Sequence, residues 1–322
     1  MIQYILKWAV SLGLFAWLLW SGEIQFESFQ QLARHNGYLA GVLGTQATLF
    51  LLATLRWRML ARAFLMEVSF FKLLKFFLMG EFFSLFFLGA LGGDLSRLMF
   101  LGGHEPQRKL VAAVTVILDK AIALWVLCGI GFAALWGYRP LSGSEAWVAT
   151  LRIILGLPLL GVPLALVLLH ALPSVLTVVA SRTGQLESLL SLKESLCQLP
   201  ASVYARVAVL NLLAQALLNV NFLCCAFALG VFHVPLGVFI KVVPLGFIAL
   251  ALPFSIAGLG VGQLAFARLF ELYGVAEPAL GGNVSTLHIA VWGIFALLGG
   301  VLFAFSRAKE KSEIPAGQSH GK

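Results

Sequence analysis

Two glycine-rich stretches decide the fold of this chain. The first reads Gly89-Ala-Leu-Gly-Gly-Asp-Leu-Ser-Arg97, and the second reads Pro253-Phe-Ser-Ile-Ala-Gly-Leu-Gly-Val-Gly-Gln263. Each follows a long apolar run and precedes a shorter helix. Helix-breaking residues free backbone groups that lipid cannot satisfy, so such breaks occur only where protein or a wet cavity covers them. A pair at corresponding places in two halves is typical of a membrane transporter's binding site.

The composition indicates an all-α polytopic membrane protein. The 322 residues are 60% hydrophobic and only 11% charged, whereas soluble domains are about 25% charged. The net charge of +8 does not indicate nucleic-acid binding. Most of the basic residues flank apolar runs, where they orient a membrane protein and contact anionic lipid.

The apolar runs predict six full spans and two re-entrant helical hairpins. A span needs about 20 apolar residues. The expected spans are Ile2–Trp20, Tyr38–Leu55, Leu110–Trp136, Leu151–His170, Val203–Leu229 and Val284–Phe305. The stretches Phe70–Leu101 and Pro235–Tyr273 contain the breaks and should each enter and leave on one side. We expect the first span to be uncleaved, because no small-x-small cleavage site follows Trp20.

The basic residues predict the orientation. With the N-terminus and the C-terminus both inside, 15 basic residues lie in inside segments. Only Arg34, Arg139 and Arg152 lie outside, and four more lie within the membrane layer. This bias follows the positive-inside rule. If both broken stretches crossed fully, Arg108 and Lys109 would move outside, so the re-entrant layout fits better.

The layout contains a repeat. Each half reads span, span, hairpin, span, and three crossings place the second half in the opposite orientation. We therefore expect inverted repeats, at about residues 1–137 and 150–308, within one domain of residues 1–308. Ser174–Pro200 is predicted to be an amphipathic helix on the cytoplasmic surface. Residues 309–322 are expected to be a polar cytoplasmic tail.

Charged residues inside the membrane layer usually face a cavity or a partner. At the first break, Gly92 and Gly93 would leave backbone N–H groups free at a helix start, which attracts anions. Arg97 adds a planar guanidinium group, whose N–H donors can bind two oxygens of a phosphate at once. These residues predict a site for a phosphate headgroup, with Asp94 capping the helix or orienting Arg97. Alternatively, Asp94 is only an N-cap, and Arg97 is only its ion partner or a residue reaching the interface.

Asp119 and Lys120 are consecutive on a predicted helix, so they point about 100° apart. They cannot pair well with each other, and each needs its own partner. Either both line the same cavity as Arg97, or Asp119 ties its helix to a cationic neighbour.

The second hairpin supplies further candidates for the wall of a substrate site. Proline would end one helix, serine can bond freed backbone, and the glycines permit close approach. Alternatively, the glycines serve helix packing alone. The residues concerned are Pro253, Ser255, Gly258, Gly260 and Gln263.

Glu81 is the candidate for a proton-carrying group. It lies among phenylalanines, and its nearest basic residue in sequence is Lys75. Alternatively, it is a neutral or paired carboxyl that faces protein. No catalytic triad, nucleotide loop or metal-ligand set is recognisable, so we expect no enzyme activity, no cofactor and no metal.

The chain resembles the transmembrane region of lysylphosphatidylglycerol synthetases, the flippase part of a bacterial resistance factor. The resemblance covers about residues 5–305 and rests on three motifs. These are Gly-Asp-x-x-Arg at Gly93–Arg97, the acid–base pair Asp119-Lys120, and Pro-x-Ser-x-x-Gly-x-Gly-x-x-Glu at Pro253–Gln263. Relatives often have proline before the first motif, where this chain has Gly89-Ala90-Leu91. Their usual glutamate is Gln263, which cannot titrate.

The resemblance implies a lipid translocase of the bacterial inner membrane. It would move a phosphate-bearing headgroup, of the anionic or prenyl-phosphate class, between leaflets. The aminoacyl-transferase domain of full-length relatives is not in this sequence, so we expect that the chain does not make lysyl-lipid itself. One alternative is a membrane-embedded transferase, which would need clustered carboxylates such as Asp94 and Asp119. Another is a non-transporting partner of a lipid- or glycan-modifying enzyme. A second copy of the chain is a further candidate partner.

Overall fold

The chain is helical throughout the part that the computed structural model describes. That part comprises residues 16, 20, 26–86, 90–136, 145–171, 199–251, 259–275 and 277–313. The expected span Ile2–Trp20 and the expected surface helix Ser174–Pro200 lie almost wholly outside it. Its helices are α2 (Asn36–Ala63), α3 (Phe70–Phe86), α4 (Ala90–His104), α5 (Lys109–Trp136), α6 (Glu145–Ala171), α9 (Ala201–Ala228), α10 (Leu236–Ala251), α11 (Val261–Leu272) and α12 (Pro278–Glu313), with short 3-10 segments at Phe26–Ala33 and Pro106–Arg108.

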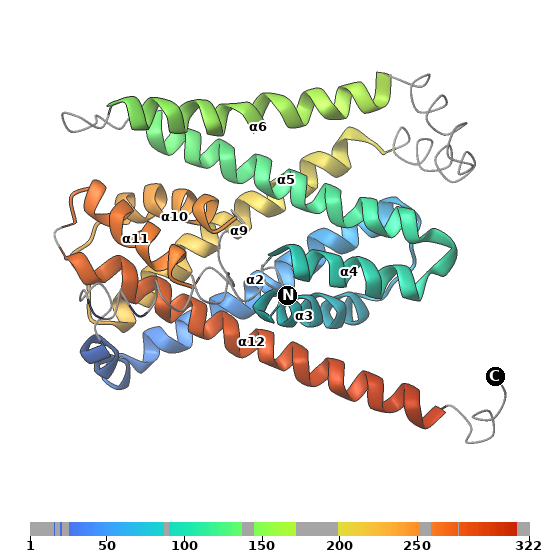
Figure 1. The fold of residues 1–322 in the computed structure, drawn as a ribbon, viewed down its shortest axis with the longest axis horizontal. Helices are drawn as coiled ribbons and strands as arrows, with labels where there is room; N and C mark the ends of the chain where they lie inside the picture. Colours follow the sequence, from blue (N-terminus) through green and yellow to red (C-terminus); the bar gives the residue numbers. More distant parts are fainter. Residues whose placement is uncertain are drawn as a thin grey trace.

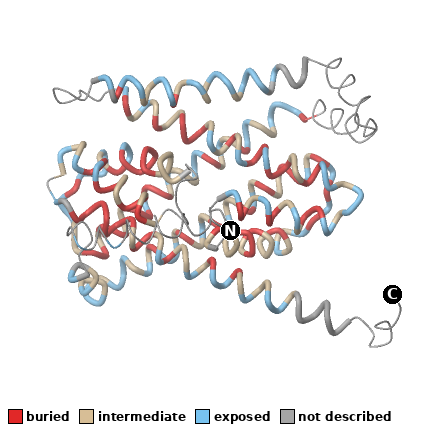
Figure 2. Tube along the Cα trace, in the orientation of Figure 1, coloured by how far each residue is buried: buried red, intermediate tan, exposed pale blue. Residues whose placement is uncertain are grey.

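Five of the described helices are long and apolar enough to cross a membrane. They are α2, α5 with the turn before it, α6, α9 and α12, which match five of the six predicted spans. Figure 2 shows α6 largely exposed at one edge of the molecule. The side chains it exposes are apolar, including Ile153, Leu157 and Leu160. A long helix that presents aliphatic side chains outward is suited to lipid, and the chain is an all-α polytopic membrane protein.

The first glycine-broken stretch forms the hairpin of α3 and α4. The helices have 17 and 15 residues, so they span about 25 and 22 Å, less than the ~30 Å of a hydrocarbon core. The two ends of the hairpin meet. Lys72 Nζ donates to His104 Nδ1 at 3.0 Å, and Arg108 Nη1 donates to the Leu65 carbonyl oxygen at 2.8 Å. The hairpin therefore begins and ends together, at what we call the basic end, marked by Arg62, Lys72, Lys75, Arg108 and Lys109.

The second stretch forms the matching hairpin of α10 and α11. Its ends also meet, because His233 Nε2 lies 3.1 Å from Glu277 Oε1. The His35 ring, just before α2, packs against Phe232, whereas Leu65, just after α2, contacts Arg108. The two hairpins therefore begin at opposite ends of α2, and Figure 1 shows them at opposite ends of the molecule.

The helix contacts repeat between the two halves. Helix α2 packs on its counterpart α9. Helix α3 packs on α12, and its counterpart α10 packs on α5, the counterpart of α12. Helix α4 packs on α5, and its counterpart α11 packs on α12. Inverted repeats require hairpins that begin at opposite ends of the molecule. They also require that each helix contact in one half has an equivalent between the corresponding helices of the other half. The placement of the two ends relative to the cytoplasm stays a prediction.

Glycines allow the first hairpin to pack closely. A Cβ on Gly93 would lie 2.8 Å from the Gly80 carbonyl oxygen, so α3 and α4 touch through their backbones. A Cβ on Gly299 of α12 would overlap the Leu78 carbonyl oxygen of α3. Small residues let membrane helices approach until backbone meets backbone. Helix α3 is thereby held between α4 and α12 with little freedom to shift.

Several helices extend beyond the predicted apolar spans. Helix α2 continues past Leu55 to Ala63, and α12 continues to Glu313. Placing Arg56 in a segment beyond the span was wrong, because it lies within α2 and is mostly buried. The first residues of the predicted polar tail, 309–313, continue helix α12, and the tail itself stays a prediction. Apolar content fixes where a span enters lipid, whereas helical hydrogen bonding continues beyond that depth.

Candidate functional site

Arg97 of α4 is the centre of an ion network at the first hairpin. Its Nη2 contacts Glu81 Oε1 of α3, and its Nη1 lies 3.4 Å from Asp94 Oδ1. The guanidinium carbon lies 3.8 Å from the centre of the Phe77 ring. The Arg97 side chain is only 11% exposed. The arginine is therefore fixed on both sides by carboxylates and on one face by an aromatic ring.

The network continues into two more helices. Lys120 Nζ of α5 lies 3.1 Å from Asp94 Oδ2, and the Trp292 Nε1–H of α12 donates to Glu81 Oε2 at 2.9 Å. The chain of contacts thus joins α12, α3, α4 and α5 and contains two acidic and two basic groups. Lys120 is its open member, since 53% of its side chain is exposed.

The two glycines of the first motif do not begin a helix. Helix α4 already includes Ala90, so Gly92 and Gly93 lie inside it. The prediction that Asp94 caps the helix was wrong, because Asp94 lies inside α4. Gly92 and Gly93 lie in the first turn of the described helix, where backbone N–H groups have no partner within the helix, so free N–H groups there stay a prediction. Gly93 instead provides the close approach to Gly80. The helix tolerates these glycines because packing against α3 offsets their cost of about 1 kcal/mol each.

Asp119 lies apart from this network. Its two carboxylate oxygens accept from Nε and Nη2 of Arg56 on α2, the second at 2.8 Å, and Arg56 Nη1 donates to Asn211 Oδ1 on α9. The side chains of Arg56 and Asp119 are 12% and 7% exposed. Of the two interpretations of Asp119, the geometry favours the tie to a cationic neighbour. Asp119 and Lys120 do have separate partners, as predicted.

Glu81 is not isolated among aromatic side chains. It contacts Arg97 and accepts from Trp292. Lys75 is its nearest basic residue in sequence, but the hairpin brings α4 back alongside α3 and places Arg97 against Glu81. The role of Glu81 as a proton carrier stays a prediction.

The second hairpin holds a buried amide at the start of α11. Gln263 is fully buried, and its Oε1 accepts from the Gly260 backbone N–H at 2.8 Å. Gly260 has φ of +81°, which favours glycine. Pro253, Ser255 and Gly258 lie outside the described residues, so the proposed wall of the site is described here only at Gly260 and Gln263.

The sequence model of one protein family, described as "Lysylphosphatidylglycerol synthase TM region", matches residues 4–307. The chain belongs to this family. The resemblance inferred from the three motifs is thereby confirmed. Comparison with curated proteins and with solved structures found no match.

In this lysylphosphatidylglycerol synthase TM region, the three motifs lie in different surroundings. Gly93–Arg97 and Lys120 share the ion network, Asp119 belongs to the Arg56 pair, and Gln263 caps α11. Sequence reasoning missed three residues: Arg56, Asn211 and Trp292. Arg56 looked like an ordinary residue flanking a span. Trp292 is 211 positions from Glu81, and no local pattern links residues so far apart.

Proposed function

We propose that the protein translocates a phosphate-bearing lipid headgroup between the two leaflets, while the lipid chains stay in the bilayer. Membership of the lysylphosphatidylglycerol synthase TM region family supports a function in membrane lipids. The observation that carries the proposal is the charged network of Glu81, Arg97, Asp94 and Lys120 on the first hairpin. Charges inside a membrane protein are costly and usually mark a substrate path.

A headgroup phosphate can exchange with a carboxylate in this network. Lys120 is exposed, and its partner Asp94 also faces Arg97. A phosphate that approaches Lys120 would compete with Asp94 for both cations. Charge-assisted hydrogen bonds to arginine and lysine suit carboxylate and phosphate alike. Such an exchange keeps every charge paired, which limits the cost of moving an anion through a low-dielectric region.

The geometry gives less support to a transferase. A transferase would need carboxylates gathered at one site, and the two candidates were Asp94 and Asp119. Asp94 contacts Arg97 and Lys120, whereas Asp119 contacts Arg56 on another helix. The described residues also contain no group of three or more His, Cys, Asp or Glu side chains that could hold a metal ion.

The test is a leaflet-resolved lipid assay in proteoliposomes with a panel of headgroups. Arg97→Lys replaces the guanidinium group, which can donate two parallel hydrogen bonds, by an ammonium group that acts as a point charge. We expect a roughly tenfold lower rate, the effect of losing one hydrogen bond of about 1.5 kcal/mol to a charged group. Arg97→Gln should lose nearly all activity.

Arg62→Gln is the control, because Arg62 is an exposed cation at the basic end that belongs neither to the network nor to α3 or α4. It should translocate lipid at the wild-type rate. Normal translocation by a folded Arg97→Gln protein would refute the proposal. A wild-type protein that moves none of the headgroups would favour the non-transporting partner.

A further inference from the structure

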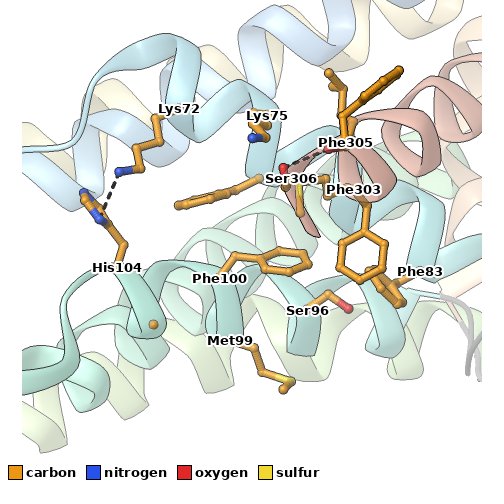
Figure 3. A pocket seen from close by; sticks show the side chains of 14 residues that line it. Lys72, Lys75, Phe83, Ser96, Met99, Phe100, His104, Phe303, Phe305 and Ser306 are labelled. Atoms are coloured by element: carbon orange, nitrogen blue, oxygen red, sulfur yellow. Dashed lines mark hydrogen bonds between the residues drawn. The ribbon is translucent and has the colours of Figure 1, made fainter. Parts of the chain in front are cut away.

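A large groove lies at the basic end between α3, α4 and α12. Its volume is about 1130 Å³, above the ~300–1,000 Å³ of most small-molecule sites. Figure 3 shows Lys72, Lys75 and His104 toward one part of it and the rings of Phe83, Phe100 and Phe303 further along. The flank facing outward carries exposed apolar side chains, since Met99 is 64% and Phe305 is 71% exposed. The groove therefore borders the lipid-facing surface.

The groove is polar at one end and aromatic along its length. Lys72 and Lys75 lie in the first two turns of α3, and His104 is the last residue of α4. From Lys72, the lining residues of α3 continue to Phe83, eleven positions later. That distance is about 16 Å at 1.5 Å per residue, or about half of a ~30 Å hydrocarbon core. The groove matches the depth of one leaflet.

The lysines are available to an anion. Among the described residues, neither Lys72 nor Lys75 forms an ion pair with a carboxylate. Lys72 donates to His104 Nδ1 at 3.0 Å. Because an ammonium group can only donate, this nitrogen of His104 accepts and the ring proton sits on Nε2. The headgroup end of the groove thus offers three donors and no carboxylate in its lining.

The groove is separate from the ion network of Arg97. The residues of α4 that line it are Ser96, Met99, Phe100, Gly103 and His104, which share one helix face by their three- and four-residue spacing. Asp94 and Arg97 lie on another face of α4, toward α3 and α5. A molecule in the groove would lie beside the network without contacting its charges.

We propose that this groove holds one anionic phospholipid of the leaflet at the basic end. Its phosphate lies against Lys72, Lys75 and His104, and one acyl chain lies along the surface formed by the contacting rings of Phe76, Phe83 and Phe100. Basic residues near a membrane surface attract anionic lipid, and the aromatic lining excludes water from the chain. This site is a second lipid site, and its occupation does not depend on translocation.

The experiment compares retained lipid by native mass spectrometry of the full chain in detergent. The probes are phosphatidylglycerol and phosphatidylcholine with identical acyl chains. Lys72→Gln/Lys75→Gln removes the two cations of the groove. Arg62→Gln/Lys109→Gln removes two exposed cations from the same end of the molecule and is the matched control. Gly103→Trp fills the groove while keeping both lysines, because a Cβ there meets nothing within 4 Å.

We expect wild type and the control to retain phosphatidylglycerol over phosphatidylcholine. Loss of both lysines should weaken phosphatidylglycerol retention roughly 30-fold, from the combined contribution of two basic residues near an anionic lipid. Gly103→Trp should reduce retention of both lipids. Added inorganic phosphate should not displace the lipid, because it lacks the acyl chain.

Equal retention of phosphatidylglycerol by the groove variant and the control would overturn the proposal, as would unchanged retention by Gly103→Trp. If the double variant does not fold, Lys75→Gln alone serves as the test, with a smaller loss expected. The measurement reports binding without transport, so its failure is distinct from failure of translocation.

Discussion

Two mostly buried arginines, Arg56 and Arg97, form ion pairs in different surroundings. Arg56 is enclosed by Asp119 and Asn211, and it joins α2, α5 and α9. Arg97 is likewise mostly buried, but its network ends on the exposed Lys120. We call the buried Arg56–Asp119 pair the closed pair, because protein encloses both side chains, and such a pair can only hold helices together. A network that ends on an exposed lysine can exchange one of its carboxylates for a ligand. From these different surroundings we propose a structural role for Arg56 and contact with the substrate for Arg97.

Removing one partner of the closed pair should destabilise the protein strongly. Asp119→Ala leaves the Arg56 guanidinium buried beside an unfilled site, and the expected loss is about 3–5 kcal/mol in the free energy of unfolding. The measurement is the thermal unfolding midpoint in detergent, which should fall.

Replacing both partners by apolar residues tests the reason for this loss. Arg56→Met/Asp119→Leu removes both charges together and should lose less than Asp119→Ala. The remaining loss, about 1–3 kcal/mol, comes from the buried Asn211 Oδ1, which loses its donor. If the double variant is as unstable as Asp119→Ala, the instability does not come from an unpaired charge.

The partners of these charged residues show where sequence reasoning stops. The separate pairing of Asp119 and Lys120 followed from helix geometry alone. The identity of their partners did not, because Arg56 is 63 positions from Asp119 and Asn211 is 155 from Arg56. A buried charge demands a partner, but only tertiary packing decides which one.

At the scale of helices, the glycine contacts position the first hairpin. The Gly299 Cβ would overlap backbone atoms of α3, and backbone cannot turn aside as a side chain can. Gly293 lies on the same helix, and a Cβ there meets nothing within 4 Å. One helix therefore contains both a packing glycine and a matched control.

Gly299→Ala should force α12 away from α3 and break the contact of Trp292 with Glu81. We expect a loss of about 1–3 kcal/mol from overpacking, seen as a lower unfolding midpoint together with slower lipid translocation. Gly293→Ala should keep or slightly raise the midpoint, since alanine favours a helix over glycine. Equal effects of the two substitutions would show that the close approach does not matter.

The helices themselves were largely predictable. Both hairpins and five of the spans follow from apolar length and glycine breaks, because these features act locally. The position of Asp94 inside α4 was not predictable, because Gly92 and Gly93 resemble a break in the helix, whereas the described helix already includes Ala90. The groove at the basic end was also missed, since it forms only where α12, distant in sequence, packs against the hairpin of α3 and α4.

At the scale of the whole molecule, the two hairpins should open to opposite sides of the membrane. Their ends lie at opposite ends of α2, and the basic residues gather at one of them. In a cysteine-free background, Lys72→Cys and His104→Cys should react only from the cytoplasmic side. Pro278→Cys should react only from the outside.

Labelling of residues 72 and 104 from different sides would contradict the re-entrant layout. Labelling of residues 104 and 278 from the same side would contradict the inverted repeat. Either result would also mean that the ion network lies at a different depth in the membrane from the one that this layout predicts.

The central claim is that the Arg97 network moves the lipid headgroup and does more than hold the hairpin. The most direct measurement compares two paired neutralisations in the leaflet-resolved lipid assay. Glu81→Gln/Arg97→Gln replaces the Glu81–Arg97 ion pair by two neutral amide side chains. Arg56→Gln/Asp119→Asn replaces the Arg56–Asp119 pair by two neutral amide side chains. Paired neutralisation leaves neither Arg56 nor Asp119 as an unmatched charge, so folding should be retained. We predict that the Arg56 pair translocates lipid at close to the wild-type rate and that the Arg97 pair does not. Translocation by a folded Glu81→Gln/Arg97→Gln protein at the wild-type rate would contradict the account.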